Sequence, residues 1–154
     1  MAQIRDSGSL GASSGTVPPI GRRAARPDAI APDGSEIRSL AGATHAATRA
    51  SLCEVCLPAG GVSRPVRHRT VEELWYVLEG AGHIWRCPPE TASDRAEPLA
   101  VRPGDSLVIP TGWSFQFRAD ESAPLRFLCF TSPPWPGDAE AVSVERGGLG
   151  EPTV

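Results

Sequence analysis

The chain has 154 residues and a formal net charge of −3, with 40% apolar and 21% charged residues. This is the composition of an ordinary globular protein with one domain and tails, and the basic stripe of a nucleic-acid-binding protein is absent. No run of about 18 apolar residues predicts a membrane span. Arg5 and Asp6 stand where a signal peptide would have its apolar stretch. We therefore expect a cytoplasmic protein.

The basic residues show a strong bias. All 15 are Arg, and the chain contains neither Lys nor Asn. Because the codons of Lys and Asn are rich in A and T, this bias indicates a GC-rich genome. The number of Arg residues is therefore weak evidence for an anion-binding site.

The two ends of the chain lack the patterns of a packed domain. Residues 1–27 are rich in Gly, Ser, Ala and Pro without an aromatic residue, so we expect a disordered leader, with a misassigned start codon as the alternative. The domain is predicted over residues 28–138, beginning with a turn signal at 32–34 and an Ala-rich stretch at 41–50 that fits a strand or a helical turn. Residues 139–154 are again Gly-rich and predict a loose tail.

From Ala50 onward the pattern is that of an all-β domain. Short apolar runs alternate with Pro and Gly turns, and no helical period interrupts them. This pattern is typical of a β-sandwich or β-barrel. The runs are 52–57, 74–78, 83–87, 99–101, 107–109, 115–117 and 125–130. All nine aromatic residues lie between Trp75 and Trp135, so this segment must supply most of the core.

The four cysteines are expected to be reduced thiols in the cytoplasm. Cys53 and Cys56 have the spacing of half a zinc site, but a second such pair is absent from the sequence. If residues 51–57 form a strand, the two thiols point to opposite faces and cannot reach one metal. We interpret them as small apolar side chains.

Two further segments leave alternatives open. His83 follows the turn at 80–82, and the register of that hairpin decides whether it faces inward or outward. The sequence Pro-Pro-Trp-Pro-Gly at 133–137 is rigid and extended, which fits a lid or a strap across the mouth of a barrel.

Two segments resemble the signature motifs of the cupin superfamily, in particular its small single-domain members. The first motif, G-x5-H-x-H-x3,4-E-x6-G, is matched by Gly60, Val66, His68, Glu73 and Gly80. The second, G-x5-P-x-G-x2-H-x3-N, is matched by Gly104, Pro110, Gly112, Phe115 and Ala119. The Gly and Pro framework fits without a gap. The resemblance implies an all-β, double-stranded β-helix (jelly-roll or cupin barrel), and it also implies a homodimer.

The resemblance is poor for metal chemistry. Cupins typically bind a divalent metal through two His and the Glu of the first motif and the His of the second. Only His68 and Glu73 are kept here, because Val66 and Phe115 replace the other two ligands. Since metal sites of this kind usually need three protein ligands, the resemblance implies no metal or a weakly bound divalent one at His68 and Glu73. His83, Cys87 or Glu72 would have to complete the shell.

Strand parity predicts what lines the barrel. Positions two apart share a face, so the interior is expected to hold Val66, His68, Glu73, Trp75, Phe115 and Phe117, with Gln116 pointing away. A mostly apolar pocket with one imidazole and one carboxylate is typical of a small-ligand site. Val66, Trp75, Phe115 and Phe117 would shape the pocket around the ligand.

His68 and Glu73 could act as general base and acid. A carboxylate beside an imidazole raises the pKa of His, and an aromatic wall raises the pKa of Glu by desolvation. Such a pair suits proton transfer at carbon, as in isomerases, epimerases, lyases and polyketide cyclases of cupin type. The alternatives are a metal-dependent oxygenase with an unusual third ligand, and a small-ligand-binding protein in which the pair is a remnant. In each case the partner is a small molecule, without nucleic acid or membrane.

Overall fold

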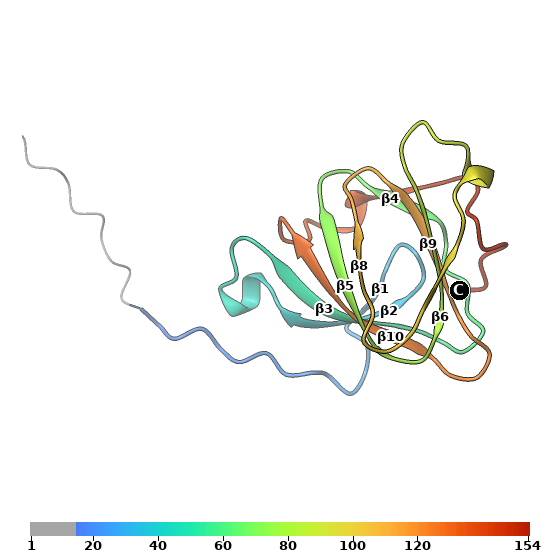
Figure 1. The fold of residues 1–154 in the computed structure, drawn as a ribbon. Coiled ribbons are helices and arrows are strands. Elements are labelled where there is room, and N and C mark those ends of the chain that lie inside the picture. Colours follow the sequence, from blue (N-terminus) through green and yellow to red (C-terminus); the bar gives the residue numbers. More distant parts are fainter. Residues whose placement is uncertain (1–14) are drawn as a thin grey trace, which may run out of the picture.

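The structure is a computed structural model that describes residues 15–154 (Figure 1). The leader predicted over residues 1–27 therefore lies partly outside the described residues. Two antiparallel sheets face each other, as expected for a double-stranded β-helix. One has the order β1 (Ala29–Ile30), β2 (Glu36–Ala41), β3 (Ser51–Leu57), β10 (Leu125–Ser132), β5 (Glu72–Glu79) and β8 (Ser106–Ile109). The other has the order β11 (Ala141–Ser143), β4 (Val66–His68), β9 (Ser114–Ala119), β6 (Gly82–Cys87) and β7 (Leu99–Val101).

Helical structure is confined to three short 3₁₀ turns in the described part of the chain. These are η1 (Ala43–His45), η2 (Ser93–Arg95) and η3 (Asp138–Glu140). Across residues 15–154 the structure contains no helix with the length and apolar character needed to span a membrane. The Ala-rich stretch at 41–50 takes up the end of β2 and the η1 turn.

The strands form where β-rich apolar runs are bounded by Pro and Gly, and side-chain alternation sets their faces. Along β5 the residues Glu73, Trp75 and Val77 are buried while their neighbours Leu74 and Tyr76 are exposed. The same alternation buries both ends of the three-residue strand β4 and leaves Arg67 exposed. The predicted parity of the two strands of the first motif is therefore confirmed.

An aromatic cluster fills much of the space between the sheets. Trp75 stacks on Phe127, with ring centroids 4.0 Å apart and an interplanar angle of 20°. Phe115 and Phe117 pack edge-on against Trp75 from β9 in the opposite sheet. Because each of these rings is nearly completely buried, the cluster holds the two sheets together and closes part of the barrel.

The C-terminal segment, expected to be loose over residues 139–154, is instead packed on the barrel. Strand β11 pairs with β4, and Leu149 is buried beside Trp85 in a second small core. Gln116 points away from the barrel interior as predicted, but this segment covers it: its Oε1 accepts the N–H of Leu149, and its Nε2 donates to the carbonyl of Gly150. Gly148 allows the close approach, because a Cβ there would lie 2.1 Å from the Trp85 ring. This packing rests on one Leu and two Gly rather than on an apolar run, so it has little signal in the sequence.

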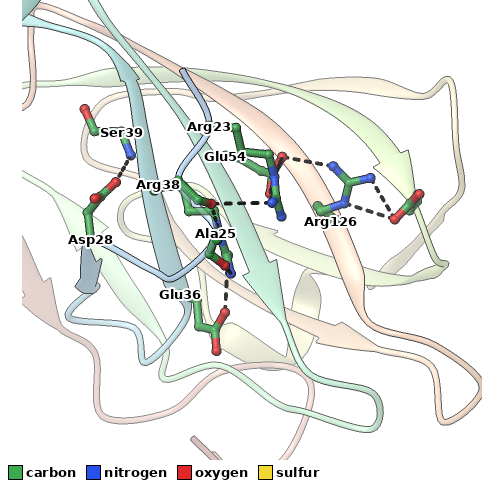
Figure 2. A network of polar contacts seen from close by, with 10 residues as sticks. Arg23, Ala25, Asp28, Glu36, Arg38, Ser39, Glu54 and Arg126 are labelled. Carbon is green, nitrogen blue, oxygen red and sulfur yellow. Dashed lines mark hydrogen bonds and ion pairs between the residues drawn. The ribbon is translucent and has the colours of Figure 1, made fainter. Parts of the chain in front are cut away.

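Residues 23–25 of the predicted leader are bound to the outer face of the first sheet (Figure 2). The Arg23 guanidinium pairs with the buried carboxylate of Glu54 at 2.8 Å, and Arg126 pairs with the same carboxylate at 2.9 Å. Arg38 donates to the backbone carbonyls of Ala24 and Ala25. The ordered domain therefore begins before residue 28.

Candidate active site

His68 and Glu73 are brought together at the junction of β4 and β5. The distance between His68 Nδ1 and Glu73 Oε1 is 3.5 Å, and only 5% and 6% of the two residues is exposed. The short connection between the strands turns the chain so that the last residue of β4 and the second residue of β5 face the same interior. The structure thus places the predicted acid–base pair side by side inside the barrel.

Glu140 holds this connection in place. Its carboxylate accepts hydrogen bonds from the backbone N–H groups of Thr70 and Val71 and from the Thr70 hydroxyl. Burial alone would raise the pKa of the Glu140 carboxyl, but these hydrogen bonds together lower it below its ordinary value. Glu140 lies in the segment that was predicted to be loose, so the sequence did not indicate its role.

We expect Glu140→Ala to destabilise the fold by about 3 kcal/mol, because two N–H groups of the β4–β5 connection lose their acceptor. Urea denaturation monitored by Trp fluorescence measures the change. Glu145→Ala removes the same charge from an exposed position in the same segment and is the control. Equal stability of the two variants would show that Glu140 does not hold the connection.

Glu73 is a carboxyl group in a poorly solvated position. The Trp75 indole N–H donates to its Oε2 at 2.8 Å. Burial raises the pKa of Glu73 to about 7, and the charge of Asp33 adds to this, while hydrogen bonds from Trp75 and Cys129 oppose it. The predicted direction for Glu73 is confirmed, and at neutral pH both its protonated and its ionised form are populated.

His68 behaves differently from the expectation. Its ring contacts the rings of Phe115 and Trp135 edge-on, each with a centroid distance of 5.1 Å. Burial lowers the pKa of His68 to about 4, and the charge of Glu140 only partly opposes this. The prediction that a neighbouring carboxylate would raise the pKa of His68 is wrong, because loss of solvation outweighs the attraction. His68 is therefore neutral at pH 7, and its buried Nδ1 finds no hydrogen-bond partner among residues 15–154 despite the 3.5 Å approach of Glu73.

Both side chains line a cavity of about 490 Å³. Val66 and Trp75 also line it, whereas Phe115 and Phe117 pack against Trp75 as part of the core and are set back from the cavity. Among the lining residues that were not predicted as site residues are Asp33, Cys53, Phe127, Cys129, Thr131 and Trp135.

Two of the missed residues, Asp33 and Trp135, come from segments whose place in the fold the sequence leaves open. Asp33 lies in the turn between β1 and β2, where its Oδ1 accepts hydrogen bonds from the backbone N–H and hydroxyl of Ser35. The sequence showed the turn but not that it faces the cavity. Trp135 lies in the Pro-rich segment expected to be a strap, and its backbone N–H donates to the Ser51 hydroxyl. That segment does lie against the cavity.

Comparison of the sequence with known protein families identifies the family to which the chain belongs. The sequence profile of the Cupin domain matches residues 53–131, which contain most of β3, most of β10 and the strands between them. The chain belongs to the cupin family. It is also 32% identical over 107 residues to an uncharacterized protein of Methanocaldococcus jannaschii, covering 69% of this chain and 79% of that protein.

Solved cupin structures share the fold at low sequence identity. The polyketide cyclase RemF from Streptomyces resistomycificus superposes with a TM-score of 0.60 at 23% identity, covering 82% of each chain. A variant of oxalate decarboxylase from Bacillus subtilis gives 0.68 at 15% identity, covering 84% of this chain and 33% of that one. KdgF from Halomonas sp. gives 0.54 at 20% identity, covering 69% and 85%. At these identities the likeness concerns the fold alone.

The donor set of this cupin does not fit a tightly held divalent metal. Val66 and Phe115 occupy two of the four ligand positions of the cupin motifs, and both are buried apolar side chains. Of the three residues considered as a replacement ligand, His83 lies 3.8 Å from Asp120 outside the cavity lining, Cys87 is buried in the second core, and Glu72 is exposed. Within residues 15–154 no three His, Cys, Asp or Glu side chains form a group that could hold a metal ion. His68 and Glu73 remain as two donors, fewer than such a site needs.

Proposed function

We propose that this cupin is a non-oxidative enzyme of the isomerase, epimerase, cyclase or lyase type, which moves a proton at a carbon atom of a small organic molecule. The observation that carries the proposal is the Glu73 carboxyl, which lines a largely apolar cavity and has a pKa of about 7. A group whose pKa lies near the working pH is well suited to proton transfer, because a large share of it is ionised and can act as a base. After it has taken up the proton, it can also give the proton back as an acid.

The chemistry follows from the protonation states of the pair. The ionised Glu73 removes a proton from a C–H bond next to a carbonyl group, and the electron pair of that bond moves to the carbonyl oxygen as an enolate. Neutral His68 has one N–H donor that can bind this oxygen where negative charge develops. Glu73, now protonated, returns the proton to the same or another atom, which completes an isomerisation or sets up the next bond. The Trp75 N–H bonded to Glu73 keeps the carboxyl oriented between the two steps.

Two observations support this reading over the alternatives. The pair is buried, and no three His, Cys, Asp or Glu side chains of residues 15–154 form a group that could hold a metal ion, which favours acid–base chemistry over a metal-dependent oxygenase. One neighbour in fold carries the name of a polyketide cyclase, and cyclisation is among the reactions that the pair could perform. A binding protein without catalysis remains as an outcome of the test below.

Deuterium uptake from D₂O tests the proposal. The full chain is incubated with a panel of small cyclic and acyclic ketones, and deuterium at carbon is measured by mass spectrometry. We expect uptake whose rate rises with pH through an apparent pKa near 7, as Glu73 ionises. Glu73→Gln should slow it by about 10²- to 10⁴-fold, the usual contribution of a general base. Glu72→Gln, an adjacent exposed glutamate on the other face of β5, is the matched control.

Uptake that survives in Glu73→Gln would contradict the proposed role. Elemental analysis of protein purified without chelator separates the oxygenase: near-stoichiometric iron, manganese or zinc that is lost on His68→Ala would replace acid–base chemistry by metal chemistry. Ligand binding without uptake in any member of the panel would favour the binding protein.

We also propose that the protein is a homodimer. Four large apolar side chains lie exposed on the outer face of the first sheet: Leu74, Tyr76, Val108 and Phe130. An exposed apolar patch of this kind is typical of an interaction surface. Analytical ultracentrifugation of the full chain tests the proposal, and a monomer at micromolar concentration would exclude it.

A further inference from the structure

We propose that the cavity takes a small molecule that carries a protonated amine on an apolar body the size of one or two rings. The inference rests on the proposed function only for the choice of cavity, because it concerns binding and not the reaction. Three features carry it: the acids of the cavity wall, the lack of cationic side chains among the described lining residues, and an unpartnered buried polar group.

The cavity wall is acidic. Its lining residues include three carboxylic acids, Asp33, Glu73 and Asp138, one from each of three separate parts of the chain. None of the described Arg residues lines the cavity, and the single imidazole, His68, is neutral at pH 7. An anionic ligand such as a carboxylate or a phosphate would therefore meet repulsion without a compensating cation.

Two of these carboxyl groups, those of Glu73 and Asp33, form no ion pair with an Arg of the described chain. Glu73 accepts a hydrogen bond from the Trp75 N–H, and its one ion-pair contact is with neutral His68. Asp33 accepts hydrogen bonds from Ser35, and burial raises its pKa although these hydrogen bonds and the charge of Arg64 oppose the rise. The Arg64 side chain is directed to the carbonyl of Pro32. A ligand ammonium placed between the carboxyl groups would supply the missing charge.

Arginines are plentiful nearby, but they neutralise acids elsewhere. On the outer face of the same sheet, Arg23 and Arg126 both pair with Glu54, and Arg38 pairs with Glu36 (Figure 2). The chain therefore balances its outer carboxylates with cations and leaves those of the cavity unbalanced. A buried acid that the protein itself does not pair is a place for a cationic ligand.

The remaining wall fits an apolar body. Trp75, Phe127 and Trp135 present aromatic rings to a cavity of about 490 Å³, which suits a molecule of one or two rings. Aromatic faces attract cations as well as apolar groups. The Nδ1 of His68 in the same wall is buried without a hydrogen-bond partner in the described part of the chain, so the wall holds a polar group that the protein itself leaves unpaired.

Matched ligands that differ only in charge test the inference. Amine, alcohol and carboxylate are compared on a phenylethyl, an indolylethyl and a naphthylethyl skeleton by isothermal titration calorimetry with the full chain at pH 7.5. On at least one skeleton the amine should bind about tenfold or more tightly than the alcohol, and the alcohol more tightly than the carboxylate. An alcohol or carboxylate that binds as tightly as its amine on every skeleton would overturn the inference, and so would a lack of binding by all amines up to millimolar concentration.

Asp33→Asn provides the variant, because Asn keeps the acceptor for Ser35 and removes only the charge. It should weaken the amine about tenfold and leave the alcohol unchanged. Asp120→Asn, which removes a charge beside His83 and outside the cavity lining, should change neither. If both variants weaken amine binding equally, the preference for amines reflects the net charge of the protein and not Asp33. That result would overturn the assigned site. Amine binding without deuterium uptake would support this inference while refuting the enzyme, so the two failures are distinguishable.

Discussion

Replacing Gly80 by Ala is expected to lower the free energy of unfolding by at least about 3 kcal/mol. Gly80 ends the first motif and follows β5, with φ at +73°, a conformation that costs an Ala about 1–2 kcal/mol. In addition, an Ala Cβ would lie 2.0 Å from the carbonyl oxygen of Pro124. This atom belongs to the backbone, so it cannot move aside without displacing the start of β10. Urea denaturation of the purified variant measures the loss.

The variant Gly104→Ala separates the two causes of the stability loss expected at Gly80, which are the positive φ and the short contact with Pro124. Gly104 begins the second motif and also has a positive φ, +92°, but apart from Gly104 and its two chain neighbours no atom of the described chain lies within 4 Å of the position of its Cβ. Only the conformational cost of about 1–2 kcal/mol is expected there. If both variants lose the same stability, the close approach of the two chain segments at Gly80 contributes nothing. The family pattern of glycines would then reflect turn geometry alone.

The second large effect concerns pH. The pKa of Glu73 is raised from 4.5 to about 7 in the folded protein, so its contribution to stability is fully present below pH 4.5 and is lost as the pH rises through 7. Glu73→Gln cannot ionise and keeps an acceptor for the Trp75 N–H. Relative to the original protein, it should be close to neutral at pH 4.5 and more stable by about 3 kcal/mol at pH 9. Chemical denaturation at several pH values measures the difference.

His68 should show the opposite dependence. Its pKa is lowered from 6.5 to about 4, so its contribution to stability is present above pH 6.5 and is lost as the pH falls through 4. His68→Gln should therefore gain stability relative to the original protein as the pH falls from 6.5 to 4. Between pH 4.5 and 6.5 the two groups oppose each other in the original protein. If the stability of both variants relative to the original protein changed with pH in the same direction, burial would not control the pKa values of Glu73 and His68.

The first cupin motif shows how much of the site can be predicted from the local sequence pattern. The alternation of buried and exposed residues along β5 and β4 follows from the period of an extended chain, so the sequence is enough to assign Glu73 and His68 to the interior. The pKa of His68 could not be predicted correctly, because it depends on how completely Phe115 and Trp135 exclude water from the ring. Local sequence does not determine that quantity.

What the sequence determined by itself is therefore the β-barrel, its strand faces, the family and the two central polar side chains. These depend on properties of single residues and on spacings within about twenty positions. Only the tertiary structure decided that Asp33 and Trp135 join the cavity, that Glu140 supports the β4–β5 connection, and that residues 144–154 cover Gln116. The contacts of Glu140 with Val71 and of Leu149 with Gln116 join segments more than 30 residues apart through a few hydrogen bonds, and such contacts leave no periodic pattern in the chain.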